Sequence, residues 1–314
     1  MTPGPRAAAP ILVVGSVALD SIETPFETRE DVLGGAAVHF SAAASLFTQV
    51  RLVGIVGRDF PLDALDILRA RDVDLAGLEV VDGPSFRWRG RYHLDMNHRD
   101  TLDLQLGVFS DFRPTLPDAF RDSEVVFLAN TDPELQLQVL GQASAARLTA
   151  CDTIDHWITD KRAAIDELFG RVDLVFLNED EARLYADTPN LQKAAAAVLA
   201  QGCRGVLIKK GENGAVVVFR GAGGAAPETF VCAAYPLEEV VDPTGAGDAF
   251  AGGVMGVLAA NRDFELWSLR RAVVTGAVLA SFNVEGFGPH GLDHIGPPEI
   301  EARFEEVRSM VAFA

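Results

Sequence analysis

One short stretch of the chain, residues 242–253, sets a lone carboxylate beside a glycine-rich turn. The sequence there reads Asp-Pro-Thr-Gly-Ala-Gly-Asp-Ala-Phe-Ala-Gly-Gly. Gly245 and Gly247 permit backbone angles and close approaches that a side chain would block. The apolar run from about residue 246 is typical of a buried helix, whose first turn has unpaired N–H groups and the positive end of the helix dipole. The stretch therefore predicts a site for an anion such as a phosphoryl group.

Asp248 falls in the first turn of that helix, beside the predicted anion site. A carboxylate in this place is able to take a proton from a substrate hydroxyl as the hydroxyl attacks a terminal phosphate. The plainer explanation is an ordinary helix-start residue, because acidic residues are favoured there. That explanation accounts for the aspartate but not for the small residues around it. The spacing matches neither a P-loop nor a Rossmann turn.

The same run resembles a known family. DPTGAGDAFAGG is similar to the C-terminal signature of the PfkB carbohydrate kinases, also called the ribokinase family. The resemblance implies ATP-dependent transfer of the γ-phosphate to an alcohol, with Asp248 as the catalytic base. The N–H groups of Gly245, Ala246 and Gly247 then form the anion hole. The fold that the resemblance implies is α/β: a ribokinase-like three-layer α/β/α sandwich with a central, mostly parallel sheet and a small β lid.

Two segments near the N-terminus hold candidates for binding the phosphate acceptor. Asp20 follows the first expected strand, and strand ends of this kind are where open α/β sheets bind ligands. Gly34 and Gly35 precede a small-residue helix and allow the backbone to approach a ligand closely. A turn residue and a close helix contact are the plain explanations. The resemblance implies instead that Asp20, Gly34, Gly35 and His39 bind the acceptor.

Two positions in these segments depart from the family pattern. His39 stands where the family usually has Asn, and Ala18 stands two residues before Asp20, where Asn is common. His39 retains a polar group for a sugar hydroxyl, whereas Ala18 removes one usual contact. The departures argue against a ribokinase and favour a different polyol or a nucleoside as the acceptor.

An acidic cluster follows the apolar segment 174–177. Asn178 is able to cap a helix there, and the acidic residues that follow it interact favourably with the positive end of the helix dipole. This is a sufficient structural explanation of the cluster. The N-x-x-E motif of the family matches Asn178 and Glu181. The resemblance therefore implies that Glu181 holds Mg²⁺ through water and that Asn178 helps to position the phosphates of ATP.

A second candidate for binding the nucleotide is the turn after residues 205–209. Lys209 and Lys210 precede a G-x-x-G loop, and a hairpin turn is its simplest interpretation. Similar proteins use this loop to contact ATP, so the resemblance implies that Gly211 and Gly214 bind the nucleotide. Lys209 or Lys210 adds positive charge. Side chains alternate along a strand, so the two lysines face opposite sides, and the sequence leaves open which one faces the nucleotide.

Asn283 ends the last long expected helix, where a helix C-terminal residue is the plain interpretation. In similar proteins this region lines the adenine pocket and lies near a site for a monovalent cation such as K⁺. The resemblance implies that Asn283 contacts the nucleotide, and that Asp242 and Thr244 are candidate ligands of the cation.

The composition argues against several partners and compartments. The 314-residue chain has a formal net charge of -18, which opposes binding to nucleic acid or to an anionic membrane. Its cysteines are widely spaced and odd in number, which indicates reduced core thiols in a cytoplasmic protein. These cysteines are Cys151, Cys203 and Cys232. The apolar run at 11–15 is too short for a signal peptide and predicts a buried strand.

Strand-like and helix-like segments alternate along most of the chain, which favours a parallel sheet covered on both faces. We expect one kinase domain over 11–290 and a C-terminal helix in 291–314 that packs on it. The expected strands are 11–14, 50–56, 125–129, 148–151, 174–177, 205–209 and 215–219. The expected helices are 36–47, 62–70, 134–143, 160–169, 179–185, 191–201, 246–260 and 266–282.

Two segments, about 16–28 and 84–106, break this alternation and show the two-residue period of half-exposed strands. They predict a small extra sheet. The resemblance implies that this sheet is a lid over the acceptor and that it often pairs with another subunit, which makes a homodimer an expected arrangement. The lid carries the arginines Arg87, Arg89, Arg91 and Arg99. The first three share one strand face, which favours a solvated or interface face over a site for a charged substrate.

The leading hypothesis is an ATP- and Mg²⁺-dependent kinase that phosphorylates a hydroxymethyl group of a sugar or related polyol. A nucleoside kinase of the same fold is the nearest alternative, because Phe86, Trp88 and Tyr92 are able to stack on a base. A third hypothesis is a non-catalytic sugar-binding regulator that retains the fold. The intact Asp248 and its glycine loop argue against the third.

Overall fold

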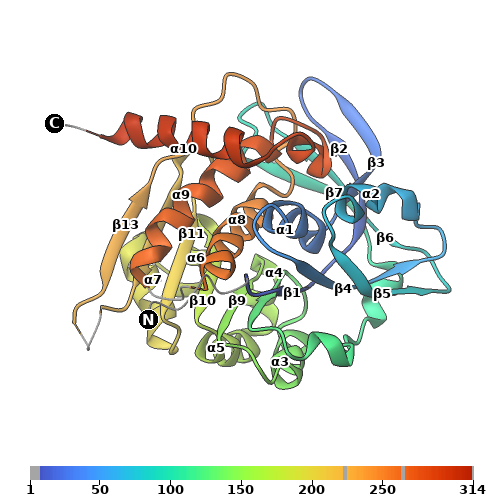
Figure 1. Cartoon of the computed structure of the whole chain (residues 1–314), viewed down its shortest axis with the longest axis horizontal. Helices are drawn as coiled ribbons and strands as arrows, with labels where there is room; N and C mark the ends of the chain where they lie inside the picture. The colour runs from blue at the N-terminus through green and yellow to red at the C-terminus, as the bar shows by residue number, and fades with distance from the viewer. Residues whose placement is uncertain (1–7, 222–224, 263–265, 313–314) are drawn as a thin grey trace, which may run out of the picture.

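A sheet of nine strands runs through the centre of the protein (Figure 1). The computed structural model describes residues 8–221, 225–262 and 266–312. The strands are β1 (Ile11–Val14), β4 (Val50–Gly57), β5 (Asp74–Val81), β8 (Val125–Leu128), β9 (Leu148–Asp152), β10 (Leu174–Asn178), β11 (Gly205–Lys209), β12 (Ala215–Phe219) and β13 (Glu228–Cys232). Their order is β13-β12-β11-β10-β9-β8-β1-β4-β5. Neighbours from β11 to β5 are parallel, whereas β12 and β13 extend one edge in antiparallel fashion.

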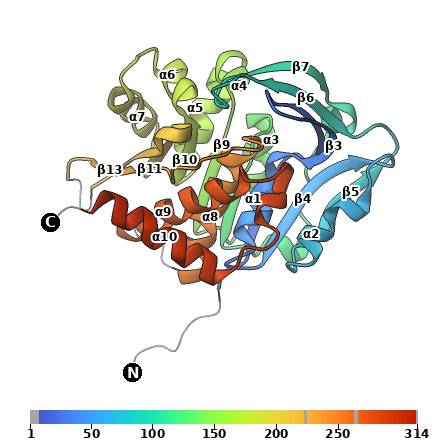
Figure 2. The same cartoon turned by 90° about the horizontal axis from the view of Figure 1, so that it is seen from above.

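Helices cover both faces of this sheet (Figure 2). One face packs against α1 (Ala36–Ala44), α2 (Asp66–Arg69), α8 (Ala246–Asn261), α9 (Leu266–Asn283) and α10 (Pro297–Val311). The other packs against α3 (Pro133–Gln142), α4 (Asp155–Asp160), α5 (Arg162–Arg171), α6 (Glu179–Ala186) and α7 (Leu191–Ala200). Within β8, Val125 and Phe127 enter the first core and Val126 and Leu128 the second. The predicted three-layer α/β/α sandwich is confirmed.

The predicted lid is a separate sheet that projects from one end of the sandwich (Figure 1). Its strands are β2 (Ala18–Glu23), β3 (Thr28–Gly34), β6 (Phe86–Tyr92) and β7 (Arg99–Gln105). Their order is β3-β2-β6-β7, with β2 and β6 parallel. The first lid segment continues to Gly34, past the predicted limit at residue 28, because β3 begins with exposed polar residues that lack an apolar alternation.

Three of the four lid arginines are neutralised inside the lid. Arg87 pairs with Asp31, and both Arg89 and Arg91 pair with Glu23 at 2.7 and 2.8 Å. Arg89 and Arg91 remain exposed to solvent. These charges form a solvated network on the lid surface.

Two strands and some helix boundaries were not predicted. β5 and β13 form the two edges of the central sheet, and most of their residues are exposed or only half-buried. They therefore lack the continuous apolar run that marks a buried parallel strand. The helix predicted at 160–169 corresponds to α5, whereas α4 before it was not predicted, and the helix predicted at 36–47 ends at Ala44. Among the helices of the described residues, none is long and apolar enough to cross a membrane.

Small residues let α1 and α8 pack closely. A Cβ atom on Gly252 would lie 2.4 Å from the carbonyl oxygen of Phe40, and one on Gly256 would lie 2.7 Å from the ring of Phe47. Contacts this short leave room only for hydrogen. The glycines of α8 therefore fix where the helix lies against α1, and with it the position of its first turn.

We expect Gly252→Ala to lower the free energy of unfolding by about 1–3 kcal/mol, because the added methyl group overpacks the contact between α1 and α8. Gly141→Ala is the matched control, since a Cβ on Gly141, near the end of α3, meets no atom within 4 Å. The control should leave stability unchanged or raise it by a few tenths of a kcal/mol. Urea denaturation measures both. Equal stability of the two variants would contradict close packing at Gly252.

Candidate active site

Polar side chains gather where the parallel strands end. Asp152 ends β9, Asn178 ends β10 and Lys209 ends β11. Asp152 is opposite Phe176 in the sheet register and Asn178 is opposite Lys209, so all four side chains share one face. Phe176 belongs to the core beneath α8, which identifies this face. Lys209 therefore faces α8, whereas Lys210 lies just after the end of β11.

The anion loop, residues 244–247, lies above this face at the start of α8. Gly245 has a φ of 74°, in the left-handed region that favours glycine. A Cβ on Gly245 would lie 2.1 Å from the ring of His39, and one on Gly247 would lie 3.1 Å from Nζ of Lys209. The loop is thus held between the His39 ring and the Lys209 ammonium, and Asp248 follows in the first turn of α8.

Asp242 ties the anion loop to a distant segment. Its side chain is fully buried, Oδ1 accepts a hydrogen bond from the Thr244 N–H at 2.8 Å, and Oδ2 accepts one from the Gly288 N–H at 3.0 Å. Both carboxylate oxygens are therefore engaged by the backbone. Burial raises the pKa of Asp242, and the hydrogen bonds from Thr244 and Gly288 oppose that rise.

His39 and Asn283 support the same loop from behind. The Asn283 side-chain amide donates to the carbonyl oxygen of Thr244 at 3.0 Å, which turns its oxygen toward Nδ1 of His39, 3.1 Å away. Nδ1 must therefore carry the imidazole proton. Burial lowers the pKa of His39 to about 4, so the ring is neutral at neutral pH. Both residues are buried, and the structure brings them to the anion loop.

On the acceptor side, Asp20 is set into the base of the lid. A Cβ on Gly34 would lie 1.9 Å from Oδ2 of Asp20, so the carboxylate occupies the space that a side chain at Gly34 would need. Gly35 has a φ of 96° and its backbone hydrogen-bonds to Asp20. Burial raises the pKa of Asp20 to about 7, with further contributions from the charges of Asp242 and Asp248. The structure thus brings Asp20, Gly34 and Gly35 together beside Asp248.

On the nucleotide side, Asn178 and Glu181 form a reciprocal cap at the start of α6. Asn178 Oδ1 accepts from the Glu181 N–H at 2.8 Å, and Glu181 Oε2 accepts from the Asn178 N–H at 2.7 Å. Burial raises the pKa of the Glu181 carboxyl, while Lys209 lowers it. The geometry of this motif is thus compatible both with a helix cap and with a contact to Mg²⁺ and the phosphates of ATP.

The G-x-x-G loop contacts the tip of the lid. Gly211 and Gly214 have φ angles of 53° and 78°. A Cβ on Gly214 would lie 2.0 Å from the carbonyl oxygen of Cys232, and one on Gly211 would lie 2.4 Å from Oδ1 of Asn97. Asn97 belongs to the turn between β6 and β7, so this hairpin spans the site from the acceptor side to the nucleotide side.

Sequence reasoning missed Asp152, and it named Tyr92 only as a candidate for base stacking and Arg99 only as one of the lid arginines. Tyr92 bonds through its hydroxyl to Thr244 Oγ1 at 3.0 Å and ties the lid to the anion loop. Arg99 lies opposite Tyr92 in the lid register and lowers the pKa of Asp248 and of Glu181. Asp152 forms an ion pair with Lys209. Asp152 could have been found from the sequence, because like Asp20 it is an acidic residue at the end of an apolar strand. The face on which Arg99 lies could not be predicted, because the pairing of β6 with β7 shifts between Arg89 and Gly90.

Asp248 is the base candidate at the centre of these groups. Burial raises its pKa, and the negative charge of Asp152 raises it further. Lys209 and Arg99 act in the opposite direction. A carboxylate whose proton affinity is increased in this way is suited to remove a proton from an alcohol near neutral pH.

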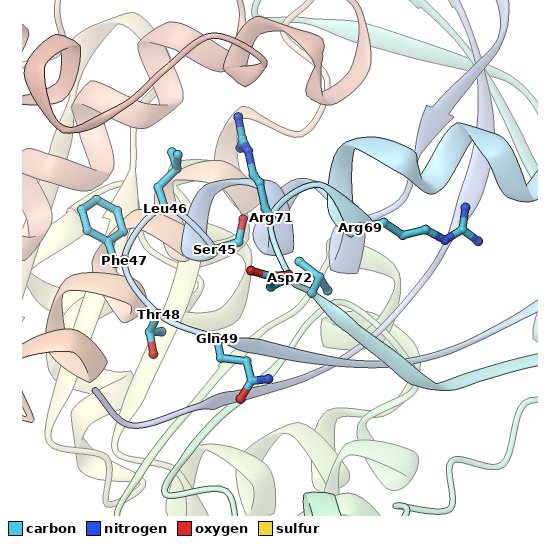
Figure 3. Close-up of a pocket in the computed structure, with 9 residues that line it drawn as sticks. Ser45, Leu46, Phe47, Thr48, Gln49, Arg69, Arg71 and Asp72 are labelled. Carbon is cyan, nitrogen blue, oxygen red and sulfur yellow. The ribbon is translucent and has the colours of Figure 1, made fainter. Parts of the chain in front are cut away.

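A cavity of about 840 Å³ lies at the amino ends of the strands, where β4 and β5 begin (Figure 3). It is lined by Ser45, Leu46, Phe47, Thr48, Gln49, Arg69, Arg71, Asp72 and Val73. Arg71 uses its guanidinium to donate to the carbonyl oxygens of Ala42 and Leu292. The cavity is therefore distinct from the Asp248 site, which lies at the carboxyl ends of the strands.

This fold and site define a phosphotransferase that acts on an alcohol group. The chain belongs to the pfkB family carbohydrate kinases, whose family model matches residues 10–291. It is 30% identical over 260 residues to a cytidine kinase of Thermococcus kodakarensis, a match that covers 81% of this chain and 90% of the relative. A nucleoside kinase of Methanocaldococcus jannaschii is 24% identical over 273 residues, covering 85% of this chain and 83% of the relative.

The fold is similar to that of solved structures in this family. The nucleoside kinase of Burkholderia thailandensis in complex with inosine aligns with a TM-score of 0.78 and 22% identity, over 95% of this chain and 99% of the other. The ribokinase of Arabidopsis thaliana with ribose and ATP aligns with a TM-score of 0.76 and 20% identity, over 95% and 99%. The predicted family and fold are confirmed, as is the prediction of a sugar or nucleoside kinase.

We expect Gly245→Ala to reduce kcat by about 10²-fold or more, the usual loss when an anion hole is disrupted. The added Cβ would be forced into the His39 ring in a conformation that alanine rarely adopts. Gly247→Ala is the matched variant and should lose less activity, because its Cβ meets only the flexible end of Lys209. Steady-state turnover measures both, and equal losses would contradict the tight contact at Gly245.

We expect kcat/KM for the acceptor to rise with pH through about 7 and to level above it. Asp248, whose pKa is raised to about 7, accepts a proton only as the carboxylate, so activity is lost as the pH falls through that value. The pKa of Asp20 is also raised to about 7, so its ionisation contributes to the same acid limb of the pH profile. A rate profile between pH 5 and 9 tests this. A limb near pH 4 would show that these carboxyls behave as solvent-exposed groups.

Proposed function

We propose that the protein is a nucleoside kinase, which transfers the γ-phosphate of ATP to the hydroxymethyl group of the nucleoside's sugar. One observation carries the choice of a nucleoside over a free sugar: Asp20 on β2 is the register partner of Trp88 on β6. Register partners on parallel strands share a sheet face. A carboxylate suited to sugar hydroxyls and a flat indole thus lie side by side. The relatedness to a cytidine kinase supports this proposal.

Trp88 is the aromatic residue best suited to a base. Its ring folds over Gly90, where a Cβ would lie 2.1 Å from the indole, and its Nε1 donates to Thr101 Oγ1 at 3.2 Å. These contacts hold the indole in one orientation, and a fixed aromatic face suits base stacking. Phe86 instead stacks on Phe109, with ring centroids 5.3 Å apart. Tyr92 uses its hydroxyl to hold Thr244.

In the proposed reaction, the carboxylate of Asp20 accepts hydrogen bonds from two vicinal sugar hydroxyls, which leaves the hydroxymethyl group directed at Asp248. Asp248 takes the proton of that hydroxyl as the hydroxyl oxygen attacks the γ-phosphorus of ATP, and the bond from this phosphorus to the bridging oxygen of the β-phosphate breaks to release ADP. The N–H groups of residues 245–247 and the positive end of the α8 dipole then stabilise the negative charge that develops on the transferred group. The lid, tied down by Tyr92, excludes water that would otherwise compete with the acceptor.

The residues of the nucleotide side fit ATP with Mg²⁺. The backbone at Gly211 and Gly214 has positive φ angles of 53° and 78°, and Lys209 adds a cation beside the anion loop. We assign Gly211, Gly214, Lys209 and Asn178 to the phosphates, and Glu181 to Mg²⁺ through water. The metal supplies neutralisation of phosphate charge when it is bound.

Asp242, Thr244 and Asn283 hold the anion loop in place. Both carboxylate oxygens of Asp242 accept backbone N–H groups, and the Thr244 carbonyl accepts the amide of Asn283. Each of these oxygens keeps a lone pair, so the contacts are compatible with a bound K⁺. We therefore propose that Asp242 and Thr244 are ligands of a monovalent cation and that Asn283 contacts the nucleotide, as the resemblance implies, in addition to positioning the loop.

We also propose a cytoplasmic protein that forms a homodimer through its lid. The described cysteines are free and buried, which supports a reducing compartment. β7 is an edge strand of the lid, and its apolar side chains Leu102 and Leu104 are 41% and 53% exposed. An exposed apolar edge strand is a surface that a second copy is able to cover. Analytical ultracentrifugation of Leu104→Lys beside the unmodified protein tests this arrangement.

The proposed activity is tested by ATP consumption with Mg²⁺ against nucleosides, sugars, sugar phosphates and polyols. We expect turnover with a nucleoside, cytidine being the first to try, and a loss of about 10²–10⁴-fold in Asp248→Asn, because the variant lacks a general base. Turnover with a free sugar alone would overturn the choice of acceptor and retain the kinase. Consumption that is unchanged in Asp248→Asn would overturn the assigned base.

We expect Trp88→Ala to raise KM for the nucleoside by about 5- to 100-fold, because stacking on a base contributes about 1–3 kcal/mol. Trp88→Phe should recover most of the affinity. Met310→Ala is the control, since Met310 is exposed on α10, outside the lid, and should leave KM unchanged. Similar KM values for Trp88→Ala and Met310→Ala would exclude the indole as the base contact.

A further inference from the structure

Asp152 is a buried carboxylate that the mechanism above does not use. It ends β9 beneath the start of α8, and it is 4% exposed. One carboxylate oxygen, Oδ1, accepts the Thr153 N–H at 2.9 Å, and the other accepts Nζ of Lys209. Its backbone carbonyl oxygen accepts the side-chain amide of Gln136 at 3.0 Å. Asp152 is therefore fixed at both its backbone and its side chain.

Lys209 is shared by three carboxylates. Asp152, Glu181 and Asp248 come from three different elements, and each interacts with the Lys209 ammonium. The ion pair within contact distance is the one to Asp152. The ammonium also lies against the anion loop, 3.1 Å from the position of a Cβ on Gly247. Asp152 thus holds the cation at the loop by a direct contact, which leaves Asp248 outside that ion pair.

The position of Lys209 matters to the chemistry of Asp248. A direct salt bridge between the two would stabilise the Asp248 carboxylate and occupy its oxygens, which makes a carboxylate a weaker base. A lysine held by another carboxylate keeps its charge near the phosphoryl position and leaves the base free. The negative charge of Asp152 acts in the same sense, since a like charge opposes ionisation of its neighbour.

We propose that Asp152 is a positioning residue for phosphoryl transfer, which holds Lys209 at the anion loop and keeps Asp248 free to act as the base. This rests on the proposed function insofar as Asp248 is the base. The charged groups that interact with Asp248 come from several elements: Asp20 on β2, Arg99 on β7, Asp152 on β9 and Lys209 on β11. Glu181 in α6 interacts with Lys209. Among them, Asp152 and Lys209 have opposite effects on Asp248 and are paired with each other.

The test compares the titration of Asp248 in Asp152→Asn and in Lys209→Met. Selective ¹³C labelling of aspartate carboxyls reports that titration by NMR in the ligand-free protein, and the signal is assigned by its loss in Asp248→Asn. We expect the midpoint to fall by about one pH unit in Asp152→Asn, which loses a like charge and releases the lysine toward Asp248. In Lys209→Met the midpoint should rise. Shifts of opposite sign are a result that a purely structural role for the pair would not produce.

The pH profile of kcat/KM gives the second readout. In Asp152→Asn its acid limb should move down by about one unit, and kcat at pH 8 should fall about tenfold because the base is weaker. Asp152→Glu, which keeps the charge, should retain an acid limb near that of the unmodified protein. Asp173→Asn is the control, since Asp173 lies just before β10, at the amino ends of the strands and away from Asp248. It accepts hydrogen bonds there from Thr149.

The two readouts separate the possible failures. An unchanged or raised Asp248 midpoint in Asp152→Asn would overturn the positioning role, whatever the acceptor proves to be. Absence of nucleoside turnover in the unmodified protein, with the NMR shifts as expected, would overturn the proposed acceptor and leave the role of Asp152 intact. If Asp152→Asn does not fold, Asp152→Glu and Lys209→Met still decide. A lower midpoint in Lys209→Met would then overturn the proposal.

Discussion

The site depends on a buried imbalance of charge: several carboxylates share one lysine where the strands of the central sheet end. Asp152, Glu181 and Asp248 all interact with Lys209, and burial raises the pKa of the latter two carboxyls. Groups of like charge in a dry place are unfavourable unless the surrounding structure holds them there. The carboxyl ends of β9 and β11 hold Asp152 and Lys209, and the first turns of α6 and α8 hold Glu181 and Asp248. The imbalance also favours a substrate that arrives with its own cations.

The opposite requirement holds at the anion loop, which must present N–H groups and no negative charge. Its shape comes from buried neutral contacts. His39 packs against Gly245, and Asn283 donates a hydrogen bond to the Thr244 carbonyl. The carboxylate of Asp242 accepts hydrogen bonds from backbone N–H groups. These contacts bring together α1, the end of α9 and the turn before α8. The glycines that let α1 and α8 pack closely are therefore as necessary to the loop as the glycines within it.

The sequence was sufficient for the parts that are local. Residues 242–253 predicted the loop, the helix and the base candidate, and apolar runs predicted the interior strands, because such features are encoded in neighbouring residues. The edge strands β5 and β13 were missed, since half-exposed strands lack that pattern. The orientation of His39 and the pairing of Asp152 with Lys209 arise between segments far apart in the chain. The spacing of residues within one segment does not predict such contacts. The side of the lid on which Arg99 lies was not predictable either, because it depends on a bulge in the pairing of β6 with β7.

The residues proposed for the acceptor and those proposed for phosphate lie in different parts of the sequence, which has a consequence for how such a protein changes over evolution. The residues that we propose to face the acceptor, such as Asp20 and Trp88, come from the first third of the chain, whereas the groups proposed to bind phosphate follow Asp152. The two sets meet through the lid at few points, among them Tyr92 with Thr244 and Asn97 beside Gly211. Mutations in the lid can therefore alter which alcohol is accepted while the inherited phosphate machinery stays intact.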